Sequence, residues 1–148
     1  MVICLIMIQP AESQTKSIVE YDSKIGFDVI RNGDVIGSHV TTFLHEGSDL
    51  NVESIMSLKI KLLGITIYSF DYRSLEKWSE GVLSKLEVDV KDGAEQISVS
   101  ALLGKEGLIV ISPSGTYVIR EPIISTNHWN PDVVTQKRVL NTLTGKIN

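Results

Sequence analysis

Residues 82–101 read VLSKLEVDVKDGAEQISVSA, two alternating apolar and polar runs on either side of Asp92-Gly93. Alternation with a period of two is typical of a β-strand with one buried face. An Asp-Gly connection between two such runs is a strong short-range signal for a hairpin. The stretch therefore predicts two antiparallel strands that share an apolar face. The predicted partners are Val88 and Ile97, Leu86 and Val99, Ser84 and Ala101, Glu87 and Ser98, and Asp89 and Gln96.

Working outward, Asn32-Gly33 and Glu80-Gly81 also separate matching alternating runs. Both dipeptides suit a two-residue turn, in which Gly readily takes positive φ. The chain thus contains at least three hairpins joined in sequence. The predicted partners are Val29 and Ile36, Phe27 and Ser38, and Ile25 and Val40 in the first hairpin. In the hairpin around Glu80-Gly81 they are Leu75 and Leu86, together with Glu76 and Lys85 as an opposite-charge pair.

The segment 50–78 continues this strand pattern. Leu63-Gly64 interrupts the alternation, which predicts a bulge, a bend or a tight turn where the buried face changes. Pro113-Ser114-Gly115 predicts one more hairpin, with residues 108–111 against residues 116–119. So many consecutive strands predict an all-β fold, an antiparallel meander curled into a barrel or half-barrel, with a sandwich as the alternative.

The carboxyl-terminal region has a different pattern. Asn130, Pro131 and Asp132 place a cap residue, a first-turn proline and a first-turn acid in order. This order predicts a short C-terminal helix after the last strands.

Composition limits the classes of function. The chain has 148 residues, is 43% hydrophobic and carries 14 basic against 18 acidic residues, a net charge of −4. A chain of this size forms one domain with its own core. No basic patch is visible, so we do not expect nucleic acid as a partner. The spacing of the three histidines, the serines and the glycines matches no metal, triad or phosphate-loop motif, so we expect no metal, no cofactor and no catalytic residue.

The amino terminus has a separate pattern. Residues 2–8 are VICLIMI, and the polar run 10–14, PAESQ, follows. An apolar block followed by small residues predicts a secretory signal over residues 1–13, although a buried first strand is the alternative. Residues 14–19 would then be a linker or frayed start, and residues 20–148 a single β-rich domain. We expect a periplasmic or secreted bacterial protein that does not span the membrane once the signal, with the sole cysteine Cys4, is removed.

Two groups of residues are candidates for a binding site. The first is an aromatic stripe on alternating positions of one predicted sheet face, and the second is the segment 125–131, STNHWNP. Aromatic side chains on one face usually form core, but they can also line a cavity beneath a curved sheet. Likewise, Trp129 could plug the core or form the wall of a site with His128 as a polar contact. The candidate ligand-binding residues are Tyr68, Tyr72, Trp78, His128, Trp129 and Asn130.

Three stretches carry a resemblance to a known family: FDVIRNGDVIG at 27–37, KLLGITIY at 61–68 and HWNP at 128–131. They resemble an uncharacterised family of bacterial exported proteins, a domain of unknown function, over residues 20–147. The final Leu143-Thr144-Gly145 also suits that family. The resemblance implies an exported β-rich protein of the envelope and brings no activity or catalytic residue. In outline the fold is similar to curved-sheet envelope proteins that shelter acyl chains, which is an analogy of fold alone.

These observations leave three hypotheses. The leading one is an exported, non-catalytic β-domain that binds a lipid-like small molecule, apolar or amphipathic, between the curved sheet and the carboxyl-terminal segment. The second is an envelope interaction or assembly protein that uses an exposed sheet edge or apolar patch. The third is a hydrolase-type enzyme acting through His128 and a carboxylate. A fully packed interior would favour the second over the first.

Overall fold

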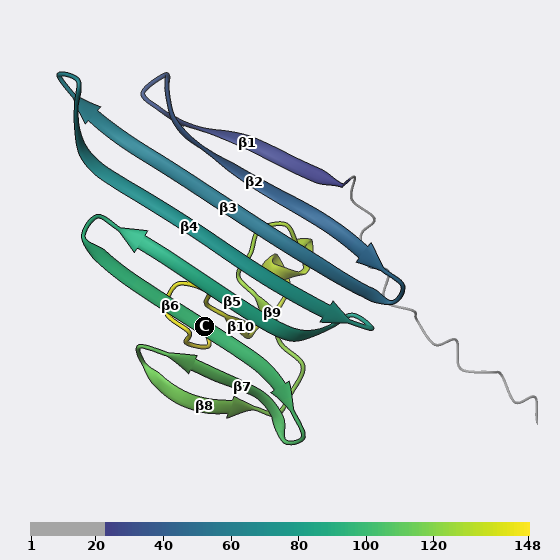
Figure 1. Ribbon diagram of the computed structural model, residues 1–148. Coiled ribbons are helices and arrows are strands. Elements are labelled where there is room, and N and C mark those ends of the chain that lie inside the picture. The colour runs from purple at the N-terminus through teal and green to yellow at the C-terminus, as the bar shows by residue number, and fades with distance from the viewer. Residues whose placement is uncertain (1–22) are drawn as a thin grey trace, which may run out of the picture.

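A computed structural model describes residues 23–148, so the predicted signal and linker lie outside the described residues. Eight antiparallel strands form one sheet in chain order, and two short strands pair in parallel beside it (Figure 1). The predicted all-β antiparallel meander is confirmed. The strands are β1 (Lys24–Arg31), β2 (Asp34–Glu46), β3 (Asp49–Leu62), β4 (Ile65–Ser79), β5 (Val82–Asp92), β6 (Glu95–Gly104), β7 (Gly107–Ser112), β8 (Gly115–Ile119), β9 (Ile124–Ser125) and β10 (Val139–Leu140).

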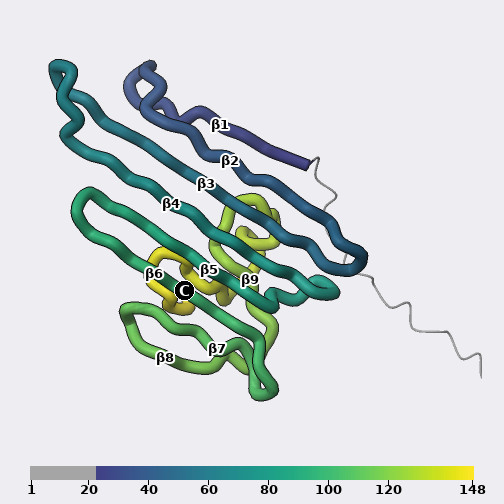
Figure 2. Tube along the Cα trace, viewed as in Figure 1, coloured from purple at the N-terminus to yellow at the C-terminus, as the bar shows by residue number. Residues whose placement is uncertain are grey.

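The sheet is open, so of the predicted barrel or half-barrel the closed barrel is wrong. Strands β1 and β8 are its two edges and do not pair with each other, as the tube in Figure 2 also shows. The strands shorten from 15 residues in β4 to five in β8. Because the sheet does not close on itself, its apolar face needs another cover. Residues 120–148, which we call the cover segment, pack against that face instead.

The main core lies between the sheet and the cover segment. Alternate residues of β4, Tyr72, Ser74, Glu76 and Trp78, point to this inner face and are buried. The opposite, outer face carries ion pairs such as that between Arg73 and Glu53. The buried apolar residues that form the core are Phe43, Leu50, Val52, Tyr72, Trp78, Leu83, Leu86, Val88, Val90, Val99, Ala101, Leu108, Val110, Ile119, Ile123, Ile124, Trp129 and Leu140.

The three tight turns predicted or allowed at Asn32-Gly33, Leu63-Gly64 and Glu80-Gly81 are two-residue turns in the structure. The first residue of each has a φ of 51–52° and each glycine also has a positive φ. Of the three alternatives for Leu63-Gly64, the structure thus selects the tight turn. The hairpin at Pro113-Ser114 is confirmed, with Leu108 opposite Ile119.

The register of the first hairpin differs from the prediction beyond the turn. Val29 pairs with Gly37 rather than Ile36, because a bulge shifts the register between Val29 and Ile30. The bulge therefore moves Val29 and Phe27 opposite the other face of β2 from the one predicted, with Phe27 opposite His39, since a slip of one residue exchanges the two faces of a strand. Gly37 is required there by contact: a Cβ atom would lie 2.1 Å from the carbonyl oxygen of Ser57.

The predicted register of the hairpin around Asp92-Gly93 is also wrong, by two residues. Asp92 pairs with Glu95, so the turn consists of Gly93 and Ala94, and Val88 lies opposite Val99. A shift of two residues leaves every side chain on its predicted face. Val88 and Val99 are accordingly both buried, as the alternation predicts.

The predicted C-terminal helix is only a single 3-10 turn, η1 (Pro131–Val134). Its predicted cap is present, because the Asn130 side chain accepts a hydrogen bond from the backbone N–H of Asp132 at 3.0 Å. None of its four residues is buried, and Val134 is 85% exposed. Without an apolar face to bury, a longer helix has no tertiary packing to stabilise it.

Candidate functional site

The most unusual feature of the interior is the side chain of Glu76. The predicted pair with Lys85 is wrong, because a bulge between Lys77 and Trp78 places Glu76 opposite Leu86. Glu76 therefore lies on the inner face of β4 and is only 3% exposed. A buried carboxylate is costly unless hydrogen bonds satisfy it.

Four neutral donors surround the Glu76 carboxylate. The indole N–H groups of Trp78 and Trp129 both donate to its Oε2 atom, at 2.9 and 3.0 Å. The Ser125 hydroxyl donates to Oε1 at 2.6 Å, and the Asn127 side-chain amide donates to the same atom. Three of these donors come from the cover segment, so Glu76 ties the cover segment to the middle of the sheet.

Asn127 extends this network along β4. Its side-chain nitrogen also donates to the Ser74 hydroxyl at 3.0 Å, and its Oδ1 atom accepts from the Tyr72 hydroxyl at 2.7 Å. Among the described residues, every buried side-chain nitrogen and oxygen has a hydrogen-bond partner. A fully satisfied network of this kind specifies one docking geometry for the cover segment.

Aromatic rings fill the space around the carboxylate. The Trp129 ring is in edge-to-face contact with Trp78 and with Phe43, with ring centroids 5.6 Å apart in each case. Trp129 is 8% exposed. The rings therefore occupy the region in which the leading hypothesis placed an apolar ligand.

Burial determines the direction of the pKa shift of Glu76. Removal from water raises the pKa of this carboxyl above its ordinary value of 4.5, and the hydrogen bonds from Ser125, Trp78, Asn127 and Trp129 lower it in part. No ion pair between this carboxylate and a cation of residues 23–148 is found. Because Glu76 is buried and its two oxygens accept from four donors, three of them in the cover segment, it acts as a structural acceptor.

Three of the six candidate binding residues meet in this network: Tyr72, Trp78 and Trp129. Tyr68 lies apart from them, partly exposed, and its hydroxyl donates to Asp92 at 2.7 Å. His128 is exposed, and Asn130 caps η1. The binding role of these residues stays a prediction.

Sequence reasoning missed Glu76, although a signal for it exists. Like Tyr72 and Trp78, Glu76 occupies an even-numbered position in an alternating run, so it falls on the same strand face as the aromatic stripe. The sequence pattern instead pairs Glu76 with Lys85 across the turn, which assumes a regular hairpin. The extra residue, Ser84, becomes visible only in the paired strands.

His39 and His128 come close together from β2 and the cover segment. The pKa of His39 is lowered, first by burial and then by the charge of His128. No group of three or more His, Cys, Asp or Glu side chains suited to a metal ion occurs within residues 23–148.

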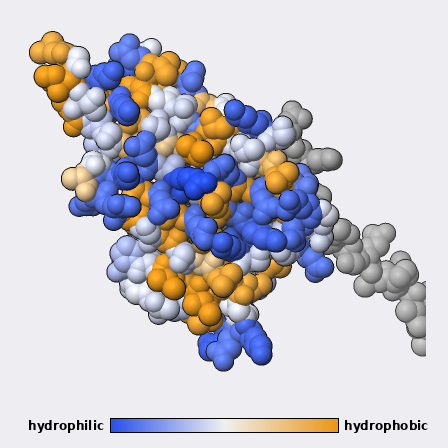
Figure 3. All heavy atoms as spheres, viewed as in Figure 1, coloured by the Kyte–Doolittle hydropathy of each residue, from blue (hydrophilic) through white to orange (hydrophobic). Residues whose placement is uncertain are grey.

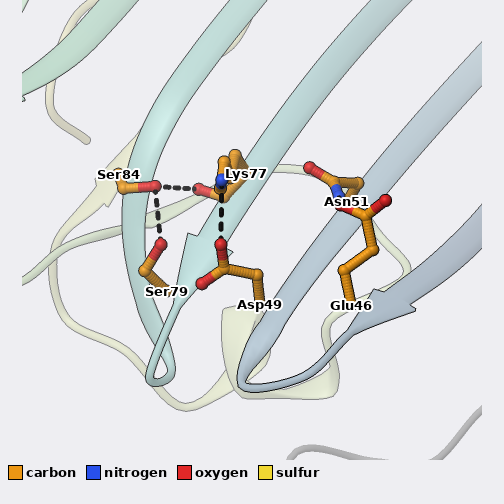
Figure 4. A network of polar contacts seen from close by, with 6 residues as sticks. All are labelled: Glu46, Asp49, Asn51, Lys77, Ser79 and Ser84. Atoms are coloured by element: carbon orange, nitrogen blue, oxygen red, sulfur yellow. Dashed lines mark hydrogen bonds and ion pairs between the residues drawn. The ribbon is translucent and has the colours of Figure 1, made fainter.

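A second polar cluster lies on the ends of β2, β3, β4 and β5 nearest Ser48 (Figure 4). Lys77 contacts Asp49 at 2.8 Å, and this contact lowers the pKa of the Asp49 carboxyl. The Ser84 hydroxyl donates to the carbonyl oxygen of Lys77 at 2.9 Å. These contacts connect neighbouring strands at the rim of the sheet, and exposed pairs of this kind contribute little to stability.

The opposite end of the sheet is apolar and exposed. Leu63, at the β3–β4 turn, is 95% exposed, and its neighbours Leu62, Ile65 and Ile67 are 60–69% exposed. We call these four residues the apolar hairpin end. In Figure 3 they correspond to the orange group that projects at the upper left, where Figure 1 shows the β3–β4 turn. An exposed apolar group of this kind marks an interaction site more often than a single exposed leucine does.

The architecture defines a class of protein: an open antiparallel sheet, one face of which is closed by its own carboxyl-terminal segment. Residues 27–148 match the family described as "Domain of unknown function (DUF6134)", and the chain belongs to that family. No match was found among the curated proteins or among the solved structures. No helix formed by residues 23–148 is both long and apolar enough to cross a membrane.

Proposed function

We propose that this chain is a non-catalytic interaction module of the bacterial cell envelope, and that it binds its partner through the apolar hairpin end. The observation that carries the proposal is the contrast in burial within one sheet. The inner face beneath the cover segment is filled by Trp78, Trp129 and Phe43, whereas Leu63 stands in water.

A packed interior favours an interaction protein over a carrier of an apolar ligand. A ligand between the sheet and the cover segment would have to displace Trp129 and break its hydrogen bond to Glu76. Binding at the apolar hairpin end requires no such rearrangement, because its side chains are already exposed. The envelope location rests on the sequence of residues 2–13 and on the family resemblance.

The test is photo-crosslinking in the cells that produce the chain. A photo-reactive amino acid replaces Leu63 in one variant and Ser48 in a matched variant, since Ser48 is exposed in a turn at the other end of the sheet. We expect an adduct, to a protein or to a lipid, at position 63 in excess over position 48. Equal or absent adducts at both positions would refute the proposal.

A second measurement separates this function from ligand transport. A fluorescent fatty-acid probe is titrated against the purified chain, with Trp129→Ala as the comparison. We expect no saturable uptake by the unmodified chain. Saturable uptake that Trp129→Ala weakens would instead support a ligand site beside the cover segment.

A further inference from the structure

We propose that the partner of the apolar hairpin end is an anionic lipid surface, into which the β3–β4 turn inserts. This inference rests on the proposed function, because it assigns a partner to the same surface. Three features of the turn support it: the conformation of Leu63, the charges beside it and the neighbouring hairpin.

Leu63 occupies a backbone conformation that its side chain does not favour. Its φ is +51°, in a two-residue turn where asparagine, aspartate or glycine is usual. The equivalent positions of the other two such hairpins carry polar residues, Asn32 with a φ of +52° and Glu80 with a φ of +51°. At Leu63 the chain thus holds a bulky apolar side chain in a strained position with no contact that buries it. Strain at such a position points to a role outside folding.

The charges beside the turn are positive, although the whole chain is negative. Residues 54–70 contain two lysines, Lys59 and Lys61, and no acidic residue, in a chain with a net charge of −4. Both lysines are exposed, and no ion pair with another described residue is found for either. Cations bordering an apolar protrusion match a surface that is apolar inside and anionic at its rim, which describes a bilayer with anionic headgroups.

The β1–β2 turn lies beside the same end and adds to it. Between the β1–β2 turn and residues 59–61 of β3 is an open depression of about 480 Å³, bordered by Arg31, Lys59 and Lys61 with Asp34 as its single acid. Ile30 and Val35 are exposed near this depression. Three cations beside a hollow between the β1–β2 turn and the end of β3 offer a place for phosphate headgroups while the β3–β4 turn enters the acyl region.

The experiment places an environment-sensitive fluorophore on the full chain. Cys4→Ser removes the only cysteine, and Thr66→Cys then carries the label at the exposed turn, with Ser48→Cys as the matched control at the other end. With vesicles of equal phosphatidylglycerol and phosphatidylcholine, we expect a blue shift at position 66 and none at position 48. Residues 2–8 are the same in both proteins, so any binding through them is common to both.

Two further variants test the assigned chemistry. Leu63→Asn, which suits the turn, should abolish the shift at position 66 without loss of folding. Lys59→Glu with Lys61→Glu should weaken binding to the anionic vesicles about tenfold or more, and pure phosphatidylcholine should bind the unmodified chain about as weakly. No shift at position 66, an equal shift at position 48, or binding that is indifferent to lipid charge would each overturn the inference.

The experiments can refute the two proposals independently of each other. A crosslink from position 63 to a protein, together with no insertion into vesicles, would overturn the lipid surface and leave the interaction module standing. Failure of both measurements would remove both proposals.

Discussion

The region around Glu76 and the apolar hairpin end belong to the same two strands, β3 and β4. Apolar side chains are buried in the first region and exposed to solvent in the second. Near Glu76 the inner face is covered, and Trp78 is 4% exposed. At the β3–β4 turn, Leu63 is 95% exposed. The cover segment reaches only part of the strands, so the strand length beyond it adds no core. The comparison teaches that β3 and β4 are longer than the core of this domain requires.

The largest expected effect comes from removing the central acceptor. Glu76→Ala leaves the indole N–H groups of Trp78 and Trp129, the Ser125 hydroxyl and the Asn127 amide without their acceptor, and it opens a cavity. We expect a loss of about 3–5 kcal/mol in the free energy of unfolding, measured by urea titration. Glu87→Gln, at an exposed position of β5, is the control and should change it by less than about 0.5 kcal/mol. Equal losses would show that the network does not hold the cover segment.

A smaller effect should follow when the ring of Trp129 is retained without its donor. Trp129→Phe preserves an aromatic side chain beside Phe43 but removes the hydrogen bond to Glu76. We expect a loss of about 1–3 kcal/mol, because a buried charged group loses one donor and the smaller ring packs less well. The measurement is again urea unfolding. A loss near zero would mean that the indole N–H contributes nothing to docking of the cover segment.

The raised pKa of Glu76 predicts a pH dependence with a definite sign. Because the folded-state pKa lies above the ordinary 4.5, the folded chain binds the Glu76 proton more tightly than the unfolded chain does. Its contribution to stability is therefore full below about pH 4.5 and is lost as the pH rises through the folded-state pKa.

The Glu76→Gln variant isolates this contribution. Urea titrations of both chains across pH 4 to 8 should show the stability of the unmodified chain falling relative to Glu76→Gln as the pH rises. A relative stability that rises over this range would mean that the four donors outweigh burial and that the pKa is lowered.

The smallest stability effect is expected at the apolar hairpin end. Leu63→Asn relieves the positive φ of Leu63 and removes no buried contact. We expect the stability to stay level or to increase by a few tenths of a kcal/mol, on the order of other favourable turn substitutions. Thermal unfolding measures the change. A clear destabilisation would show that Leu63 belongs to the core after all, and would end the contrast between the two regions.

The local chemistry of the chain was sufficient to predict the strands and, for most of them, which side chains are buried and which are exposed. Asn32-Gly33 and Glu80-Gly81 predicted two turns correctly, because the glycine of each pair takes positive φ without steric cost. The alternation around Val88 predicted its burial even though the register was shifted by two residues. The cap at Asn130 was likewise a local property and was confirmed.

Which residues pair across neighbouring strands, and whether the sheet closes into a barrel, were decided only by the tertiary structure. The extra residue Ser84 moved Glu76 from a predicted pair with Lys85 to a position opposite Leu86, and no feature of a single strand announces a bulge in its partner. The acceptor role of Glu76 depends on Ser125 and Trp129, which lie 49 and 53 residues away in sequence. The open sheet has the same cause, because whether an edge closes or a segment covers the face depends on contacts between distant parts of the chain. Local sequence thus determined the strands, turns and polar faces, while the buried carboxylate and the uncovered hairpin end followed from long-range packing.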